Sequence, residues 1–332
     1  MNLSQNSAVV VVLFVTFLWG SWFQVVKHTG KYPIAAFINW MYVFSVVIVW
    51  GSILLLQEKM VPVGITGEIF NNKTLSFVLL ICGFIFALGI QVHLSIVGRM
   101  GLVLSTSISA TCSILCGTVL SSIFGGIPEG VSFASVFLAA VVLVAAAIMC
   151  QYAGAIRDKN EKAEIRKTRL KDIILLIFCN TVLLSSYPFA ASIGISSPLN
   201  PDRMSSLTCM GILSMGAFFG SNVFTVVTLT VKKQWNDFFH PCKNIGFILF
   251  MAFLAACCHF GGNVLHAIVA PVISITIAIT MGNSYHIWNY LWGIFYGEFK
   301  GASKKTHLFL IFGILLFIIG VLILSLNIYC QE

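Results

Sequence analysis

Residues 155–172 read AIRDKNEKAEIRKTRLKD, and they divide an otherwise apolar chain into two parts. This stretch holds seven of the 19 lysines and arginines and four of the 11 aspartates and glutamates, close to the midpoint of the 332 residues. Five apolar stretches precede it and five follow it. The sequence therefore predicts a first half at 1–154, a basic linker at 155–171 and a second half at 172–332.

The composition indicates a membrane protein. Hydrophobic residues make up 58% of the chain and charged residues only 9%, whereas soluble domains carry roughly 25% charged residues. A spanning helix needs about 20 mostly apolar residues, and runs of that length recur here. They are too long and continuous for the strands of a barrel. We therefore expect an all-α polytopic protein of the cell membrane, either inner or plasma membrane, with the lipid bilayer as its surroundings.

Breaks in the apolar pattern predict ten transmembrane helices. The breaker cluster GGIPEG at 125–130 and the turn at Arg99 and Gly101 are two of these breaks, and the pair Ala270–Pro271 separates the eighth helix from the ninth. The fourth helix begins at the Arg99 turn and ends near Phe124. The other nine predicted helices cover 8–27, 33–56, 75–97, 132–153, 172–194, 205–231, 244–268, 271–296 and 306–328.

Lysine and arginine placement predicts the orientation of these helices. Sixteen of the 19 basic residues lie on the side of the linker, and the other side has Lys59, Lys73 and Arg203. Cytoplasmic loops carry an excess of lysine and arginine, so the linker is predicted to be cytoplasmic and both termini to lie outside. The net charge of +8 thus follows the membrane sides and does not indicate a nucleic-acid partner.

Five helices per half require the second half to enter the membrane inverted relative to the first. GIQVHLSIVG at 89–98 matches GGNVLHAIVA at 261–270 at a glycine, an amide side chain, a valine, an Ile-Val pair and a small residue. Inverted repeats are typical of secondary transporters, which bind their substrates near the midplane between the repeats. The sequence therefore predicts two inverted five-helix repeats.

Acidic residues are missing from the predicted membrane core. All 11 lie in loops, in the linker, at a terminus or, for Glu298, at the cytoplasmic end of the ninth helix. A carrier that relays protons through a buried carboxylate, or binds an organic cation against one, would need such an acid. The sequence therefore favours a neutral polar solute. No catalytic motif or metal cluster is recognisable, so we expect neither an enzyme nor a catalytic residue, metal or cofactor.

Amides, imidazoles and aromatic rings supply the polar groups of the predicted core. Leaving them unpaired in hydrocarbon costs several kcal/mol, so they must face one another, water or a solute. Hydrogen bonding between helices, worth about 0.6 kcal/mol per bond, is the alternative role for each residue. The residues that we predict to bind substrate are Trp19, Gln91, His93, His259, Asn263, Asn283 and His286. Arg99 and Glu298 are predicted to be gating or structural groups at the inner face.

Three histidines, His93, His259 and His286, are the predicted core groups able to titrate near neutral pH. One of them could couple transport to protons, and a structural role is the alternative for each. The sequence contains no recognisable ion site. A coupling proton or sodium ion is therefore expected only from the class of protein.

Several stretches resemble known carriers. ALGIQVHLSIVGRMGLVLSTSISATCSILCGTVLSSIFG at 87–125 and YAGAIRD at 152–158 are similar to segments of bacterial rhamnose–proton symporters. LWGIFYGEFKGASKKTHLFL at 291–310 resembles the end of plant ureide permeases and related glucose/ribose-type carriers. WGSWFQVVKHTGKYPIAAFINW at 19–40 resembles the first two helices of bacterial members of that group. These carriers belong to the drug/metabolite transporter superfamily, whose layout is two five-helix halves.

The resemblance implies a secondary active transporter that imports a small neutral polar metabolite by alternating access. A monosaccharide of the rhamnose or glucose/ribose type is the leading expectation, because aromatic faces stack on sugar rings while amides bond their hydroxyls. The alternative is a ureide, such as allantoin, or a nucleobase. A membrane sensor that binds the solute without moving it is a third possibility.

Overall fold

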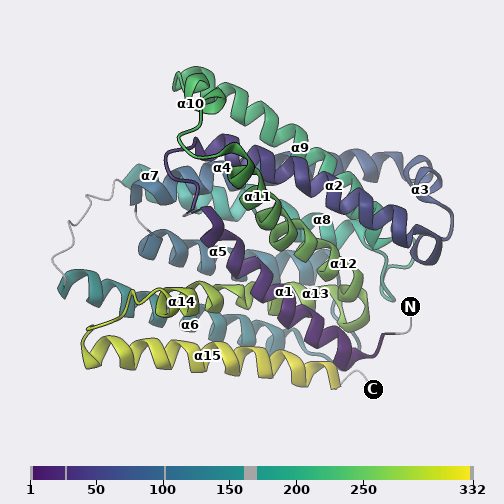
Figure 1. Ribbon diagram of the computed structural model, residues 1–332. Coiled ribbons are helices and arrows are strands. Elements are labelled where there is room, and N and C mark those ends of the chain that lie inside the picture. The colour runs from purple at the N-terminus through teal and green to yellow at the C-terminus, as the bar shows by residue number, and fades with distance from the viewer. Residues whose placement is uncertain (1–2, 27, 101, 161–169, 330–332) are drawn as a thin grey trace.

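The computed structural model describes residues 3–26, 28–100, 102–160 and 170–329 (Figure 1). Within these ranges the chain is helical and has no strand, apart from two isolated β-bridges, Ile195–Met204 and Ser197–Asn200. The prediction of an all-α protein is confirmed.

The described residues of the first half form five long helices and one short one. They are α1 (Gln5–Val26), α2 (Ile34–Met60), α3 (Ile65–Asn71), α4 (Lys73–Met100), α5 (Leu102–Phe124) and α6 (Phe133–Asn160). α6 continues beyond the predicted end of the fifth helix, so the first residues of the predicted linker are helical. Residues 161–169 of that linker lie outside the described residues.

Helices of the second half are more often interrupted. α7 (Leu170–Phe178) passes through the π-helical η1 (Cys179–Leu183) before α8 (Ser186–Gly194), and α11 (Ile245–Ala256) passes through a second π-helical segment, η2 (Cys257–Gly261), into α12 (Gly262–Ile273). α13 (Ile275–Gly282) and α14 (His286–Phe295) are joined by the 3₁₀ turn η3 (Asn283–Tyr285). The remaining helices are α9 (Ser206–Val231), α10 (Trp235–Phe239) and α15 (Lys304–Tyr329).

Eight helices of the described chain are long and apolar enough to cross a membrane. They cover Gln5–Val25, Ile34–Met60, Lys73–Ile96, Phe133–Arg157, Leu170–Gly194, Ser206–Val231, Ile245–Ile273 and Lys304–Ile328. Large apolar side chains on their outer faces, such as Leu55, Phe77 and Leu326, are exposed, as expected for a surface that contacts lipid. The chain is therefore an integral membrane protein.

The predicted break at Ala270–Pro271 is wrong. α12 continues through Pro271, and the chain breaks at Ser274, which has a positive φ of 88°. Pro271 has no N–H for the carbonyl of Ala267, but the hydroxyl of Ser206 donates to that carbonyl over 2.6 Å. Because a neighbouring helix satisfies the freed carbonyl, the proline does not end α12.

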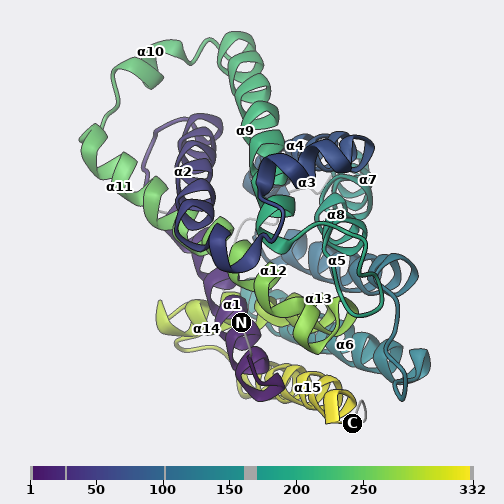
Figure 2. The same cartoon turned by 90° about the vertical axis from the view of Figure 1, so that its right-hand side faces the viewer.

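The two halves pack closely against each other. α4 lies against α9 and α6 against α15, and the second pair runs side by side in both views (Figures 1 and 2). A Cβ on Gly216 or Gly220 of α9 would collide with the backbone oxygen of Leu80 or Phe84 of α4. These glycines form the Gly-x-x-x-Gly pattern that permits close helix packing in membranes. The start of α1 and the end of α15 lie at the same end of the bundle (Figure 1).

Candidate functional site

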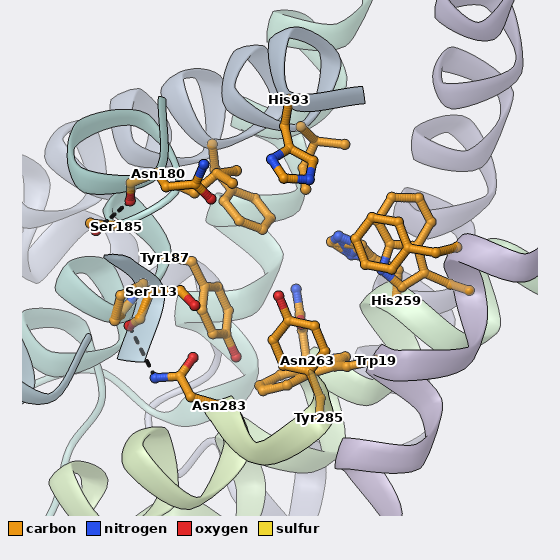
Figure 3. A pocket seen from close by; sticks show the side chains of 16 residues that line it. Trp19, His93, Ser113, Asn180, Ser185, Tyr187, His259, Asn263, Asn283 and Tyr285 are labelled. Atoms are coloured by element: carbon orange, nitrogen blue, oxygen red, sulfur yellow. Dashed lines mark hydrogen bonds between the residues drawn. The ribbon is translucent and has the colours of Figure 1, made fainter. Parts of the chain in front are cut away.

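A cavity of about 110 Å³ lies between helices of both halves (Figure 3). α1, α4 and α5 line it from the first half, and η1–α8, η2–α12 and η3 line it from the second. None of its lining residues in the described chain is an aspartate, glutamate, lysine or arginine. Its polar groups belong to His93, Ser113, Asn180, Ser185, Tyr187, His259, Asn263, Asn283, Tyr285 and the indoles of Trp19 and Trp22.

Three helices depart from regular α-geometry where they line the cavity. Asn180 lies in η1, His259 in η2, and Asn283 and Tyr285 in η3. π-Helical turns inside α-helices are frequent at functional sites. In η1 the bulge is satisfied locally, because Ser185 Oγ donates to the carbonyl of Asn180 over 2.9 Å. The interruptions therefore bring several polar side chains to the cavity, and in η1 the carbonyl of Asn180 stays bonded.

Two glycines allow the backbones of α12 and α13 to pack directly against the indole of Trp19. A Cβ on Gly262 would lie 2.8 Å from Nε1 of Trp19, and a Cβ on Gly282 would lie 2.8 Å from Cζ3 of the same ring. The indole also meets the rings of Tyr187 and Tyr285 edge to face, at 90° and 88° with centroids 5.9 and 6.2 Å apart. Trp19 is thus fixed in one orientation by α1, α12 and α13 together.

His259 and Asn263 lie one helical turn apart and enter the cavity from one side (Figure 3). Aromatic rings surround the imidazole of His259, including Trp22 at 4.9 Å and Phe86 at 5.7 Å between centroids. Three buried atoms at the cavity have no hydrogen-bond partner within the described ranges: Nε1 of Trp19, Nδ1 of His259 and Nδ2 of Asn263. The indole N–H and the amide NH₂ are donors, so two donors beside the cavity lack an acceptor within the protein.

Asn180 and Asn283 supply hydrogen-bond acceptors rather than donors. Nδ2 of Asn180 donates to the carbonyl of Leu176 over 2.7 Å, and Nδ2 of Asn283 donates to the carbonyl of Ser113 over 3.2 Å. An amide nitrogen must face each carbonyl, so the two side-chain oxygens remain as acceptors. The cavity therefore combines donors on the α1–α12 side with acceptors from η1 and η3.

Histidines 93 and 286 are linked to serines of α5. Ser109 Oγ lies 3.1 Å from Nδ1 of His93, and Ser113 Oγ lies 3.3 Å from Nε2 of His286. His93 lines the cavity, but His286 lies outside its lining. Only the first of the two imidazoles is therefore in direct contact with the cavity.

Five of the seven predicted binding residues line the cavity, namely Trp19, His93, His259, Asn263 and Asn283. Gln91 does not. Its Nε2 lies 3.2 Å from the carbonyl of Ala35 and from the hydroxyls of Ser221 and Thr225, which joins α4 to α2 and α9. This arrangement is the alternative role of hydrogen bonding between helices.

Glu298 lies just after α14 and does not line the cavity. Its carboxylate meets Arg157 of α6 at 3.4 Å, and the same guanidinium packs 5.0 Å from the ring centroid of Phe299. The contact joins the two halves at the linker end of the bundle. The side chain of Arg99, the other predicted gating group, lies outside the described residues.

Several residues at the cavity are not among the predicted binding residues. Tyr187 and Tyr285 line the cavity, and His266 supports it by placing Nδ1 3.3 Å from the hydroxyl of Tyr187. His266 was visible as the residue one place out of register with His93 in the suggested repeat. Its side chain packs on Trp19, with ring centroids 5.0 Å apart, behind the cavity wall.

Comparison with known proteins adds only the fold. No protein-family model matches the chain, and no curated protein is similar to it. One solved structure, described only as "Crystal structure of protein", superimposes with a TM-score of 0.62 at 10% sequence identity. The match covers 99% of this chain and 100% of the other. The whole chain thus shares the fold of a solved structure.

Proposed function

We propose that this protein is a secondary active transporter that imports a small neutral polar solute, in the first place a monosaccharide. The observation that carries the proposal is the cavity between the halves. It holds buried donors of Trp19 and Asn263 that have no partner in the described chain, and it is lined by no charged side chain. Unpaired polar groups are costly in a membrane, so a solute or water must satisfy them.

The proposal includes ten transmembrane helices, with both termini outside. α5 and the α13–α14 segment are added to the eight clear spans. At about 1.5 Å per residue, the 23 residues of α5 reach roughly 34 Å, more than the about 30 Å of a hydrocarbon core. The start of α1 and the end of α15 share one end of the bundle, while α6 ends and α7 begins at the opposite end, which agrees with an even number of crossings (Figure 1).

Helix contacts support an inverted repeat of five helices. In this repeat the helices of the two halves correspond in order: α1 to α7–α8, α2 to α9, α4 to α11–α12, α5 to α13–α14, and α6 to α15. α1 packs on α12, and the corresponding pair is α8 on α4. α2 packs on α11 as α9 packs on α4, and α14 packs on α1 as α8 packs on α5. The pairs α2–α9, α5–α13 and α6–α15 each join a helix to its own counterpart. A pseudo-twofold axis between the halves accounts for this pattern, and it would pass through the region of the cavity.

The alternating-access cycle would open the cavity to each side in turn as one half rocks against the other. With no carboxylate among the lining residues, a coupling proton would have to use a histidine such as His93, or sodium would be coordinated by neutral oxygens. The donor and acceptor sides of the cavity also fit a ureide or nucleobase, whose carbonyl and N–H groups are complementary to both. That is the second candidate.

The test is uptake of labelled rhamnose, fucose, glucose, ribose, allantoin and uracil into cells that express the chain, with and without a proton uncoupler and with sodium replaced. We expect one sugar to accumulate against its gradient and the uncoupler or sodium removal to abolish accumulation. Uptake of allantoin or uracil alone would favour the second candidate. Binding of a solute by the purified protein without any accumulation would indicate a sensor and contradict the proposal.

A further inference from the structure

A second hollow lies on the side of the bundle, separate from the central cavity. It has a volume of about 550 Å³, is walled by α4, α5 and the η1–α8 region, and shares Ser185 alone with the described lining of the central cavity. Its α4 wall consists of Phe77, Val78, Ile81, Cys82 and Ile85, which recur at helical spacing on one face. This lateral groove lies inside the spans Lys73–Ile96 and Leu170–Gly194, so the bilayer is its solvent.

Hydroxyl groups in the groove are already bonded to the protein. Thr181 donates to the carbonyl of Ile177, Ser185 to that of Asn180 and Ser186 to that of Leu183, at 2.8, 2.9 and 2.5 Å. The remaining wall is aliphatic or aromatic, apart from the Cys82 thiol. The hydroxyls of the groove therefore need no polar ligand as a hydrogen-bond partner, in contrast to the unpaired donors at the central cavity.

A cation stands at one end of the groove. Lys73 precedes Phe77 by one helical turn on the same side of α4, and it is exposed. Its Nζ lies 5.6 Å from the ring centroid of Phe70, near the end of the span. A lysine at that level suits the phosphate of a lipid whose acyl chain runs along the face of α4.

We propose that the lateral groove binds one acyl chain of a phospholipid from the leaflet at the Lys73 end, with Lys73 next to the lipid phosphate. Lipid tails are as apolar as the groove, so burial alone gives no preference for this place. The preference comes from the shape of the groove and from the attraction between the lipid phosphate and Lys73. Ser185 lines both the groove and the central cavity, so the bound chain packs against the π-helical segment that carries Asn180.

The experiment uses the full-length protein in phosphatidylcholine nanodiscs doped with phosphatidylglycerol that carries a diazirine on one acyl chain. After irradiation, mass spectrometry maps the labelled peptides. We expect labelling to concentrate on α4 and η1–α8. Val182→Trp fills the groove and should reduce that labelling to background, whereas Val223→Trp on α9 should not. The two valines are matched, with exposed fractions of 51% and 52%.

The headgroup contact is tested by a second pair of variants at exposed lysines. Lys73→Glu should lower the labelling about fivefold, the order expected for one basic residue near an anionic lipid. Lys59→Glu, at the end of α2, should leave it unchanged. A diacylglycerol probe with the same diazirine has no phosphate and should not respond to Lys73→Glu. Equal labelling over the whole lipid-facing surface, or equal effects of Lys73→Glu and Lys59→Glu, would overturn the proposal.

Discussion

Gln91 of α4 and Asn263 of α12 are both buried amides, each 2% exposed, and they occupy matching positions in the two segments that suggest a duplication. Nε2 of Gln91 has three oxygen neighbours at 3.2 Å, one on α2 and two on α9. Nδ2 of Asn263 has no partner among the described residues, and Asn263 lines the cavity. Amides at matching positions of the two segments therefore have opposite surroundings.

The difference separates two uses of a polar residue inside a membrane. An amide whose donors are satisfied stabilises helix packing, at about 0.6 kcal/mol per bond on average. An amide with an orphaned donor costs about 1–3 kcal/mol, and we attribute its presence to the solute that it would bind. Three sets of variants extend the comparison between bonded and unbonded polar groups to Trp19, to two tyrosines and to Glu298. They are given from the largest expected effect to the smallest.

Gly262→Ala should have the largest effect on transport. The new Cβ would lie 2.8 Å from Nε1 of Trp19 and displace the indole from the cavity wall. A displacement of about 1 Å at a site can cost on the order of a hundredfold, so we expect uptake to fall by about 10- to 100-fold. Gly261→Ala is the control, because its Cβ would have nothing within 4 Å. Equal uptake by the two variants would mean that the position of Trp19 does not matter.

The hydroxyl of Tyr187 has a hydrogen-bond partner, whereas the hydroxyl of Tyr42 has none among the described residues. Tyr187→Phe leaves Nδ1 of His266 without its 3.3 Å partner and should lower stability by about 1–2 kcal/mol. The buried hydroxyl of Tyr42 has no partner within the described ranges, so Tyr42→Phe should be neutral or stabilising. Thermal unfolding of the purified variants in detergent measures both. A larger loss for Tyr42→Phe would contradict the assignment of partners.

Glu298→Gln should have the smallest effect. The Glu298 and Arg157 side chains are 34% and 12% exposed, and ion pairs with access to water contribute about 0.2–1 kcal/mol. We expect a decrease in stability below about 1 kcal/mol and an unchanged apparent affinity for the solute. A change in uptake rate at constant stability would instead identify Glu298 as a gating group.

The sequence was sufficient for the membrane class and for the places of the long helices, because apolar runs of about 20 residues are typical of membrane-spanning helices and rare in soluble proteins. The close packing at Gly216 and Gly220 follows a pattern that is local in the sequence, since small residues four apart leave room for a neighbouring backbone. Pro271 misled the boundary prediction because its structural consequence depends on Ser206, a residue distant in the chain.

The sequence did not show how each helix is rotated about its own axis, and therefore which neighbour each side chain faces. In a helix that is apolar on most sides, one amide such as Gln91 gives no indication of which neighbour it faces. The π-helical turns at Cys179–Leu183 and Cys257–Gly261 change that rotation further, and no local pattern in the sequence indicates them. Tyr187, which lines the cavity, was therefore not among the predicted binding residues, whereas His286 was predicted and lies outside the lining.

The most direct test of the central cavity as the binding site compares Asn263→Ala with Gln91→Ala in one experiment. Thermal unfolding of each purified variant is followed with and without the sugar identified by uptake. We expect Gln91→Ala to lower the unfolding temperature while keeping the stabilisation by sugar, and Asn263→Ala to keep the unfolding temperature while losing that stabilisation. If Asn263→Ala destabilises the protein and still responds to sugar like the wild type, the central cavity is not the binding site.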